Sequence, residues 1–152
     1  MRTFLIQYYT DRIPGFGSKS LALPDLFAVC EADGIEVFRT PFDRLHGCAF
    51  FEDDAPFIFI NSTLPAAEQV IAGWHEYDHL TRHMLKTHCP YNCVFTSSGS
   101  MVNLSRIERE AQVVGCLALM PHPLVVGLSL EDIMREFGVS RNTAEFRANL
   151  LQ

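Results

Sequence analysis

The chain has 152 residues, of which 48% are hydrophobic and 20% charged, so it has enough apolar material for one continuous core and is not intrinsically disordered. Its formal net charge of −6 argues against a protein that holds nucleic acid through a basic face. We expect a single domain over residues 1–152, with residues 129–151 packed on it.

The first predicted elements are a helix and three strands. Residues 23–34 indicate a short helix that Gly34 ends. Residues 35–40 alternate like a strand, and residues 48–61 are typical of two strands joined by an acidic turn at 52–54. These segments predict an α+β fold with a small, mainly antiparallel sheet.

Helical patterns dominate the rest of the chain. Residues 62–85 form the longest of them, with Ser62 or Thr63 available as the N-cap. Residues 86–103 carry turn-forming side chains and are expected to be irregular. Residues 104–120 predict a second strong helix.

Two short helices are expected over residues 129–151, with Ser129 and Ser140 as their N-caps. A helix-turn-helix DNA-binding regulator is one interpretation of this pair. Its second helix has only Arg141 and Arg147 as positive charges, which is a poor footprint for phosphate contacts. We therefore favour two helices that pack on the core, and we expect no direct binding of nucleic acid.

The expected location of the protein is the cytoplasm. The first twelve residues do not have the pattern of a secretory signal, and the longest apolar stretch, residues 113–128, is interrupted by prolines and is too short to span a bilayer. Five cysteines without regular spacing suit a reducing compartment better than a disulfide framework.

The chemistry concentrates in the stretch "GWHEYDHLTRH", residues 73–83. Residues four apart on a helix differ by about 40° in azimuth and about 6 Å in height, so His75 and His79 can meet at one zinc ion. Glu76 is rotated away from His75 and is better placed as a general base that takes a proton from zinc-activated water. The alternative is a solvated, histidine-rich helix face without a metal.

A metal site of this kind needs a third protein ligand. Glu108 and Glu110, in the first turns of the helix expected over residues 104–120, are the candidates. The alternative for Glu108 is a capping box with Ser105, since the spacing Ser-x-x-Glu is typical of helix N-termini. Spacing alone leaves the choice between Glu108 and Glu110 open.

The ordered set of motifs resembles the ImmA/IrrE family of small bacterial metallopeptidases. His75-Glu76-x-x-His79 is followed by Glu108-x-x-Ala111 and then by "LALMP" (117–121), while "GIEVF" and "GCAFFEDDAPFIFIN" resemble the family's strands. "FGVS" with Arg147 resembles its C-terminal ending. The likeness spans roughly residues 23 to 150.

This resemblance implies a zinc-dependent metallopeptidase with His75, His79 and Glu108 as metal ligands and Glu76 as the catalytic glutamate. It also implies a protein substrate, a helix-turn-helix repressor encoded nearby, often on mobile elements or in stress responses. The alternative of the same fold is a non-catalytic metal-binding module that regulates such a partner. Tyr77 and Asp78 depart from the usual H-E-L-G-H and leave open whether the site is active.

Two further groups of histidine and cysteine are candidate sites. His83 continues the four-residue spacing and could be an outer-shell group, but a partly exposed position at the helix end is the favoured interpretation. His88, Cys89 and Cys93 could form a second zinc site, although the set is incomplete and buried packing is more usual for cysteine.

Overall fold

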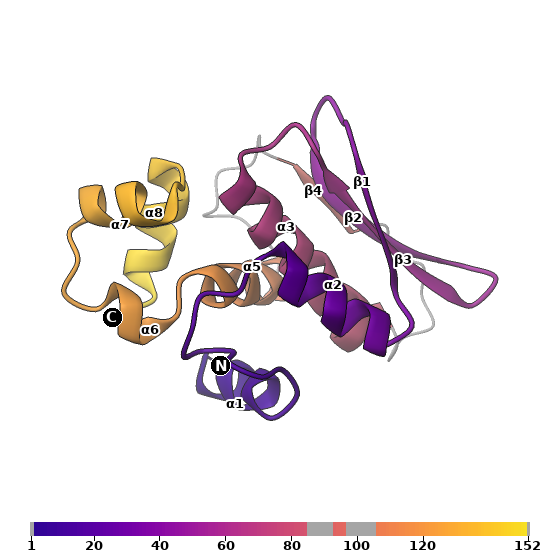
Figure 1. The fold of residues 1–152 in the computed structure, drawn as a ribbon, viewed down its shortest axis with the longest axis horizontal. Coiled ribbons are helices and arrows are strands. Elements are labelled where there is room, and N and C mark those ends of the chain that lie inside the picture. The colour runs from indigo at the N-terminus through magenta and orange to yellow at the C-terminus, as the bar shows by residue number, and fades with distance from the viewer. Residues whose placement is uncertain (1, 85–92, 97–105, 152) are drawn as a thin grey trace.

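The computed structural model describes residues 2–84, 93–96 and 106–151. Figure 1 shows a sheet with the helices gathered on one side of it. In chain order the elements are α1 (Arg2–Thr10), α2 (Leu23–Ala32), β1 (Glu36–Thr40), β2 (Leu45–Glu52), β3 (Ala55–Asn61), α3 (Ala66–Asp78), the π-helical turn η1 (His79–Met84), β4 (Cys93–Thr96), α5 (Arg106–Leu119), α6 (His122–Val125), α7 (Leu130–Phe137) and α8 (Arg141–Asn149).

The sheet has four strands in the order β1-β3-β2-β4. Strands β2 and β3 pair antiparallel, as do β2 and β4, whereas β1 pairs parallel to β3. The α+β class and the small, mainly antiparallel sheet are therefore confirmed. The expectation that residues 86–103 lack regular structure is wrong at residues 93–96, because β4 forms there by pairing with the distant strand β2.

The turn between β2 and β3 lies at the predicted acidic residues. Asp53 and Asp54 have φ values of 48° and 66°. Two consecutive residues of positive φ suit the right-handed twist of a tight hairpin, and aspartate tolerates this conformation better than most residues. The positive φ values of this turn thus explain why aspartate occupies both positions.

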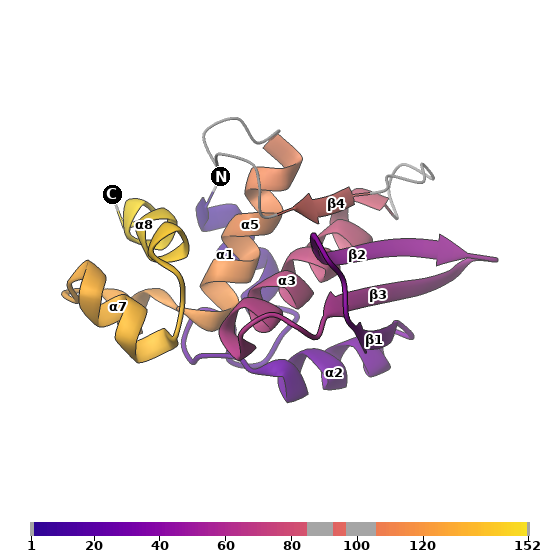
Figure 2. The ribbon, with the colours of Figure 1, turned by 90° about the horizontal axis from the view of Figure 1, so that it is seen from above.

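The two faces of the sheet differ. Helices α2 and α3 lie along one face (Figure 2), where Ala49, Ile58 and Ile60 are buried. On the opposite face four phenylalanine rings stack across β1, β3 and β2, with centroids 5.1–6.2 Å apart: Phe38, Phe50, Phe57 and Phe59. The core that supports the site lies between the first face and the helices.

Helix α3 starts later than predicted. Its N-cap is Pro65, which supplies no side-chain cap, so the expected caps Ser62 and Thr63 are wrong. The amide and hydroxyl of Thr63 instead donate to Asn61 Oδ1, at 3.0 and 2.8 Å, and hold the turn that leads from β3 into the helix.

The C-terminal helices are attached to α3 and α5. Ser140 caps α8, as predicted, and its amide donates to Glu68 of α3 at 3.3 Å. Arg147 is fully buried, and its Nε donates to the carbonyl of Met120 at 2.7 Å. Of the two positive charges named for a DNA-binding helix, one is therefore engaged inside the protein.

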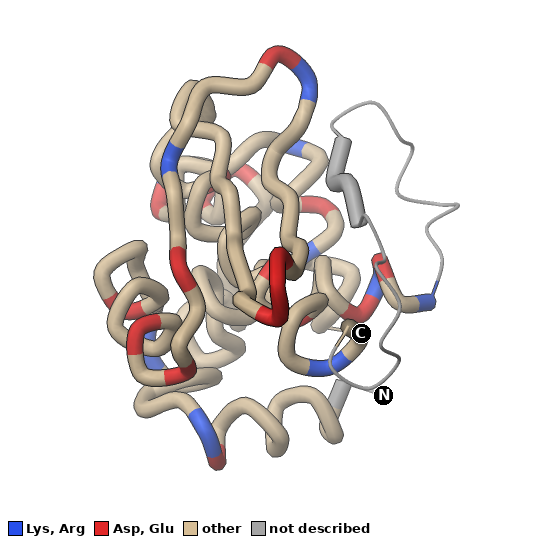
Figure 3. The backbone as a smooth tube through the Cα atoms, turned by 90° about the vertical axis from the view of Figure 1, so that its right-hand side faces the viewer, with Lys and Arg blue, Asp and Glu red and all other residues tan. Residues whose placement is uncertain are grey.

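Lys and Arg positions lie scattered over the described chain and do not gather on one element (Figure 3). Among the helices that the structure describes, none combines the length and apolar character needed to cross a bilayer.

Candidate metal centre

Two of the predicted ligands meet at the junction of α3 and η1. His75 lies in the last turn of α3, and His79 is the first residue of η1. Both side chains are buried, and their Nε2 atoms lie 2.9 Å apart. The four-residue spacing thus brings two imidazole nitrogens to one point, as the sequence predicted.

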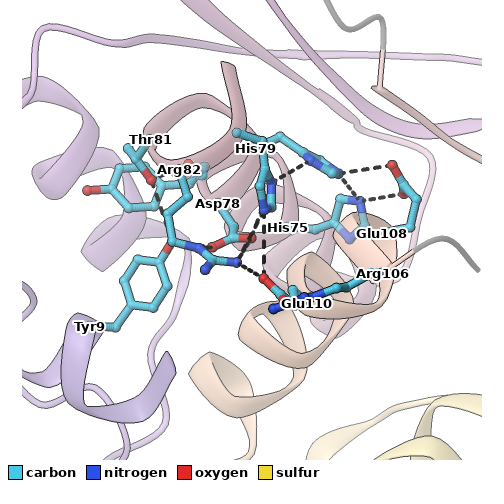
Figure 4. Close-up of polar contacts among 11 residues, drawn as sticks. Tyr9, His75, Asp78, His79, Thr81, Arg82, Arg106, Glu108 and Glu110 are labelled. Atoms are coloured by element: carbon cyan, nitrogen blue, oxygen red, sulfur yellow. Dashed lines mark hydrogen bonds and ion pairs between the residues drawn. The ribbon is translucent and has the colours of Figure 1, made fainter. Parts of the chain in front are cut away.

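Helix α5 carries Glu108 to the same point (Figure 4). Its Oε2 lies 3.4 Å from His75 Nε2, and its Oε1 lies 3.4 Å from His79 Nε2. The close approach of α5 to α3 depends on Gly115, because a Cβ there would lie 2.6 Å from the carbonyl oxygen of Ile71. A glycine on α5 therefore allows the carboxylate to reach the histidines.

The three donors fit a divalent metal of the zinc type. Ligand atoms around a tetrahedral zinc ion lie about 3.3 Å apart, given zinc–nitrogen distances of about 2.0–2.1 Å. The two imidazole nitrogens lie 2.9 Å apart, and each lies 3.4 Å from a different oxygen of Glu108. With one ligand atom from each residue, all three atoms lie within 4.8 Å of one another, so a small shift of the carboxylate would complete the set. Two imidazoles and one carboxylate are also a donor set that zinc accepts.

Glu76 follows His75 in the sequence, and its carboxylate is near enough to Glu108 for the charge of Glu108 to act on it. Its side chain is fully buried, and neither carboxylate oxygen has a hydrogen-bond partner within the described part of the chain. Burial, followed by the negative charge of Glu108, raises the pKa of Glu76 well above its usual range. A buried, unpartnered carboxylate is costly to maintain, and such groups concentrate at functional sites.

Strand β2 covers Glu76 through a residue without a side chain. An ideal Cβ on Gly47 would lie 3.0 Å from Glu76 Cγ and 3.4 Å from Glu76 Oε1. The same Cβ would lie 2.9 Å from the carbonyl oxygen of Phe59, which belongs to the backbone and cannot move aside easily. Gly47 therefore leaves the carboxylate the room that a larger residue would take.

The structure distinguishes the two candidate glutamates. Glu110 accepts from Arg82 Nη2 and from Arg106 Nε, both at 2.9 Å, and does not join the histidine cluster. Burial alone would raise the pKa of Glu108, but hydrogen bonds from His75 and His79 outweigh it and hold that pKa well below its usual range. Glu108 is thus the ionised carboxylate that faces the imidazoles.

The unusual Asp78 belongs to a second cluster of charge, which is buried except for Arg106 at its edge. It accepts from the hydroxyl of Tyr9 and from two nitrogens of Arg82, with Nε–Oδ1 and Nη2–Oδ2 distances of 2.6 and 3.1 Å. Arg82 in turn reaches Glu110, which Arg106 also binds. We call Tyr9, Asp78, Arg82, Arg106 and Glu110 the paired cluster, and Figure 4 shows it beside His75 and Glu108.

Sequence reasoning did not identify most of the paired cluster. The sequence singles out Asp78 only as a departure from the usual H-E-L-G-H motif. The four-residue spacings of Asp78 with Arg82 and of Arg106 with Glu110 are sequence signals of helical ion pairs and could have revealed it. Tyr9 carries no such signal, because it comes from a helix 69 positions away.

Tyr77, the other departure, is also engaged away from the ligand atoms. Its hydroxyl donates to Asp33 Oδ2 at 2.5 Å, just after the end of α2. Its ring packs edge-on against Trp74, with centroids 5.5 Å apart. Neither Tyr77 nor Asp78 is a member of the His75–His79–Glu108 cluster.

His83 lies near the end of η1 and is partly exposed, as the favoured interpretation of the sequence predicted. The exposed part is 13% of its side chain, because η1 continues the helix and turns the ring inward. His83 Nδ1 lies 3.2 Å from Nδ1 of His79. Burial, which outweighs the attraction of Asp78, lowers the pKa of His83 to about 4, so the ring is neutral at physiological pH.

Two predictions concern residues that the structure does not describe. The possible second zinc site depends on His88 and Cys89, and the capping box depends on Ser105. These three residues lie outside the described ranges.

Comparison with known proteins agrees with this geometry. No curated protein matches the chain. A family model for a peptidase domain, described as the IrrE N-terminal-like domain, matches residues 30–149 and so covers both the histidine helix and Glu108. On this match, the chain belongs to the ImmA/IrrE family of metallopeptidase-like domains.

Proposed function

We propose that this protein is a zinc-dependent peptidase that cleaves a specific protein partner in the cytoplasm, a helix-turn-helix repressor. The observation that carries the proposal is the carboxylate of Glu76, which is fully buried and unpartnered among the described residues, directly beside three converging ligand atoms. A group that is costly to bury is best explained by chemistry that uses it.

Each member of the cluster has a proposed role. His75, His79 and Glu108 would hold zinc, which when bound supplies a Lewis acid that lowers the pKa of water and polarises a peptide carbonyl. Glu76 takes a proton from the attacking water and delivers it to the leaving amine. Burial raises the pKa of Glu76, and a carboxylate with a raised pKa is a stronger base than an exposed one.

The departures from the usual motif are compatible with activity. Tyr77 donates to Asp33, and Asp78 is neutralised by Arg82, so neither adds an unpaired charge beside the ligands. The choice of a repressor as substrate rests on the family resemblance. The buried position of His75, Glu76 and His79 supports a single positioned segment over general digestion.

Metal content separates the two glutamates. Purified protein is expected to hold about one equivalent of zinc, and Glu108→Ala is expected to lose it because one of three ligands is removed. Glu110→Ala is the matched control and should retain zinc, since its carboxylate is bound to arginines. Absence of metal from the wild-type protein would refute the peptidase proposal.

Cleavage tests the role of Glu76. Incubation with the helix-turn-helix repressor encoded nearby should yield two defined fragments, and Glu76→Gln should slow this by about 10²–10⁴-fold while zinc stays bound. If zinc binds and neither protein cleaves, the chain is a non-catalytic module of the same fold. Salt-sensitive binding to duplex DNA would instead support the regulator interpretation.

A further inference from the structure

We propose that His83 is a positioning residue for the metal centre: its Nδ1 accepts the Nδ1–H of His79 and thereby directs His79 Nε2 to the metal. The inference rests on the proposed metal site at His75, His79 and Glu108. It assigns a role to a residue outside the ligand set and links the metal centre to the paired cluster.

The ring nitrogens of His79 have different surroundings. Nε2 faces His75 and Glu108, whereas Nδ1 lies 3.2 Å from His83 Nδ1. A neutral imidazole has one donor and one acceptor nitrogen. If His79 Nε2 binds a metal, its proton must be on Nδ1, and His83 must then accept it. Ligand histidines usually give this proton to a carboxylate, carbonyl or water, so an imidazole acceptor is an unusual arrangement.

The same requirement fixes the proton of His83. With Nδ1 as acceptor, the neutral ring carries its hydrogen on Nε2, which lies 3.9 Å from Glu110 Oε2 and 3.3 Å from Arg82 Nη2. Both hydrogens of Arg82 Nη2 have carboxylate acceptors, at 3.1 Å on Asp78 and 2.9 Å on Glu110. The contact of Arg82 Nη2 with His83 Nε2 is within hydrogen-bond distance and requires an unprotonated Nε2, because a guanidinium only donates. Since both hydrogens of Arg82 Nη2 also have carboxylate acceptors, metal binding can replace this contact with an Nε2–H that points toward the negative charge of Glu110.

The other tautomer of His83 is available only without metal. Its Nδ1–H would face Asp78 Oδ2 at 3.7 Å and the Nδ1 of a His79 that acts as acceptor. That His79 tautomer carries its proton on Nε2, the atom that the metal needs. Metal binding therefore selects one tautomer of each ring. The His83 hydrogen faces Glu110 in the metal-bound tautomer and Asp78 in the other.

Two substitutions of His83 separate positioning from packing. In His83→Gln the amide oxygen can accept from His79 and the amide nitrogen can donate toward Glu110, whereas His83→Leu can do neither. Competition with a chromophoric chelator should show zinc affinity about 10–100-fold weaker in His83→Leu and largely restored in His83→Gln. His122→Leu, which removes an exposed histidine, should bind zinc like the wild type.

Nitrogen-15 NMR of the wild-type protein gives a readout that does not depend on any variant folding. With zinc bound, His83 should show an unprotonated Nδ1 and a protonated Nε2, and His79 should show a protonated Nδ1. A protonated Nδ1 on His83, or a metal-bound nitrogen on its ring, would overturn the proposal.

The outcomes distinguish this inference from the proposed function. If the wild-type protein and His83→Leu bind zinc equally well, or if His83→Gln is as weak as His83→Leu, only the role of His83 is refuted. If the wild-type protein binds no zinc, both proposals fail.

Discussion

Two clusters of buried charge lie side by side along α3 and η1, and they are built in opposite ways. In the paired cluster, the carboxylates of Asp78 and Glu110 accept from arginine side chains, and Asp78 also accepts from Tyr9. In the metal centre, Glu76 has no hydrogen-bond partner among the described residues, and Glu108 faces two imidazoles.

The contrast separates charges that are paired within the fold from a charge that has no such partner among the described residues. A buried charge with good partners is roughly neutral for stability but costly to break, whereas an unpartnered one lowers stability as long as it remains. The unusual motif residue Asp78 belongs to the first kind. Glu76, the proposed general base, belongs to the second kind.

Breaking the paired cluster should have the largest effect. Asp78→Ala leaves Arg82 and the hydroxyl of Tyr9 buried without their acceptor and is expected to lower the free energy of unfolding by about 3–5 kcal/mol. Urea denaturation of the metal-free protein measures this. Glu131→Ala, which removes a solvent-exposed partner of Arg141, should cost about 0–1 kcal/mol. Equal effects of the two substitutions would contradict the distinction.

A Glu→Met substitution should change the free energy of unfolding in opposite directions in the two clusters. Glu76→Met removes an unpartnered buried carboxylate and should stabilise the metal-free protein by about 1–3 kcal/mol at neutral pH. Glu110→Met deprives Arg82 and Arg106 of an acceptor and should destabilise it by a similar amount. A loss of stability in both variants would show that the carboxylate of Glu76 has partners after all.

A smaller effect is expected when the pH is changed. It concerns the differences in unfolding free energy between the wild type and the variants Glu76→Met and Glu110→Met. Burial raises the pKa of Glu76, so its cost grows as pH rises above 4.5, the usual value. Burial alone would also raise the pKa of Glu110, but Arg106 and Arg82 outweigh it and lower that pKa, so its contribution is present above 4.5 and lost as pH falls below it. Urea denaturation with a chelator should show both differences from wild type shrinking towards acid pH, from opposite signs.

Much of the fold could be predicted because its signals are local. Helices α2, α3, α5, α7 and α8 and the β2–β3 hairpin follow from periodicity, helix caps and the acidic turn at Asp53 and Asp54, whereas α1 and α6 were not predicted. The four residues of β4 could not be predicted, because they form a strand only through pairing with β2. The parallel direction of β1 is likewise invisible, since an alternating pattern is the same for both directions.

The site divides in a similar way. The spacing of His75 and His79 on one helix was sufficient to predict that they meet. Glu108 and Glu110 could not be separated by spacing, because both lie in the first turns of α5. What separates them is the position of Arg82 and Arg106, which bind Glu110. The contact of His83 with His79 depends on the continuation of the helix as η1, which the sequence pattern does not reveal.

The contact between Tyr9 and Asp78 has a practical consequence for anyone shortening this chain. Helix α1 precedes the region of family likeness, which begins at residue 30, yet it supplies a hydroxyl to the middle of the histidine motif. A fragment cut at the limit of likeness would open the interior at Asp78 to solvent. The residues that match the family model are therefore fewer than the residues that a stable fragment must contain, since the fragment must include Tyr9.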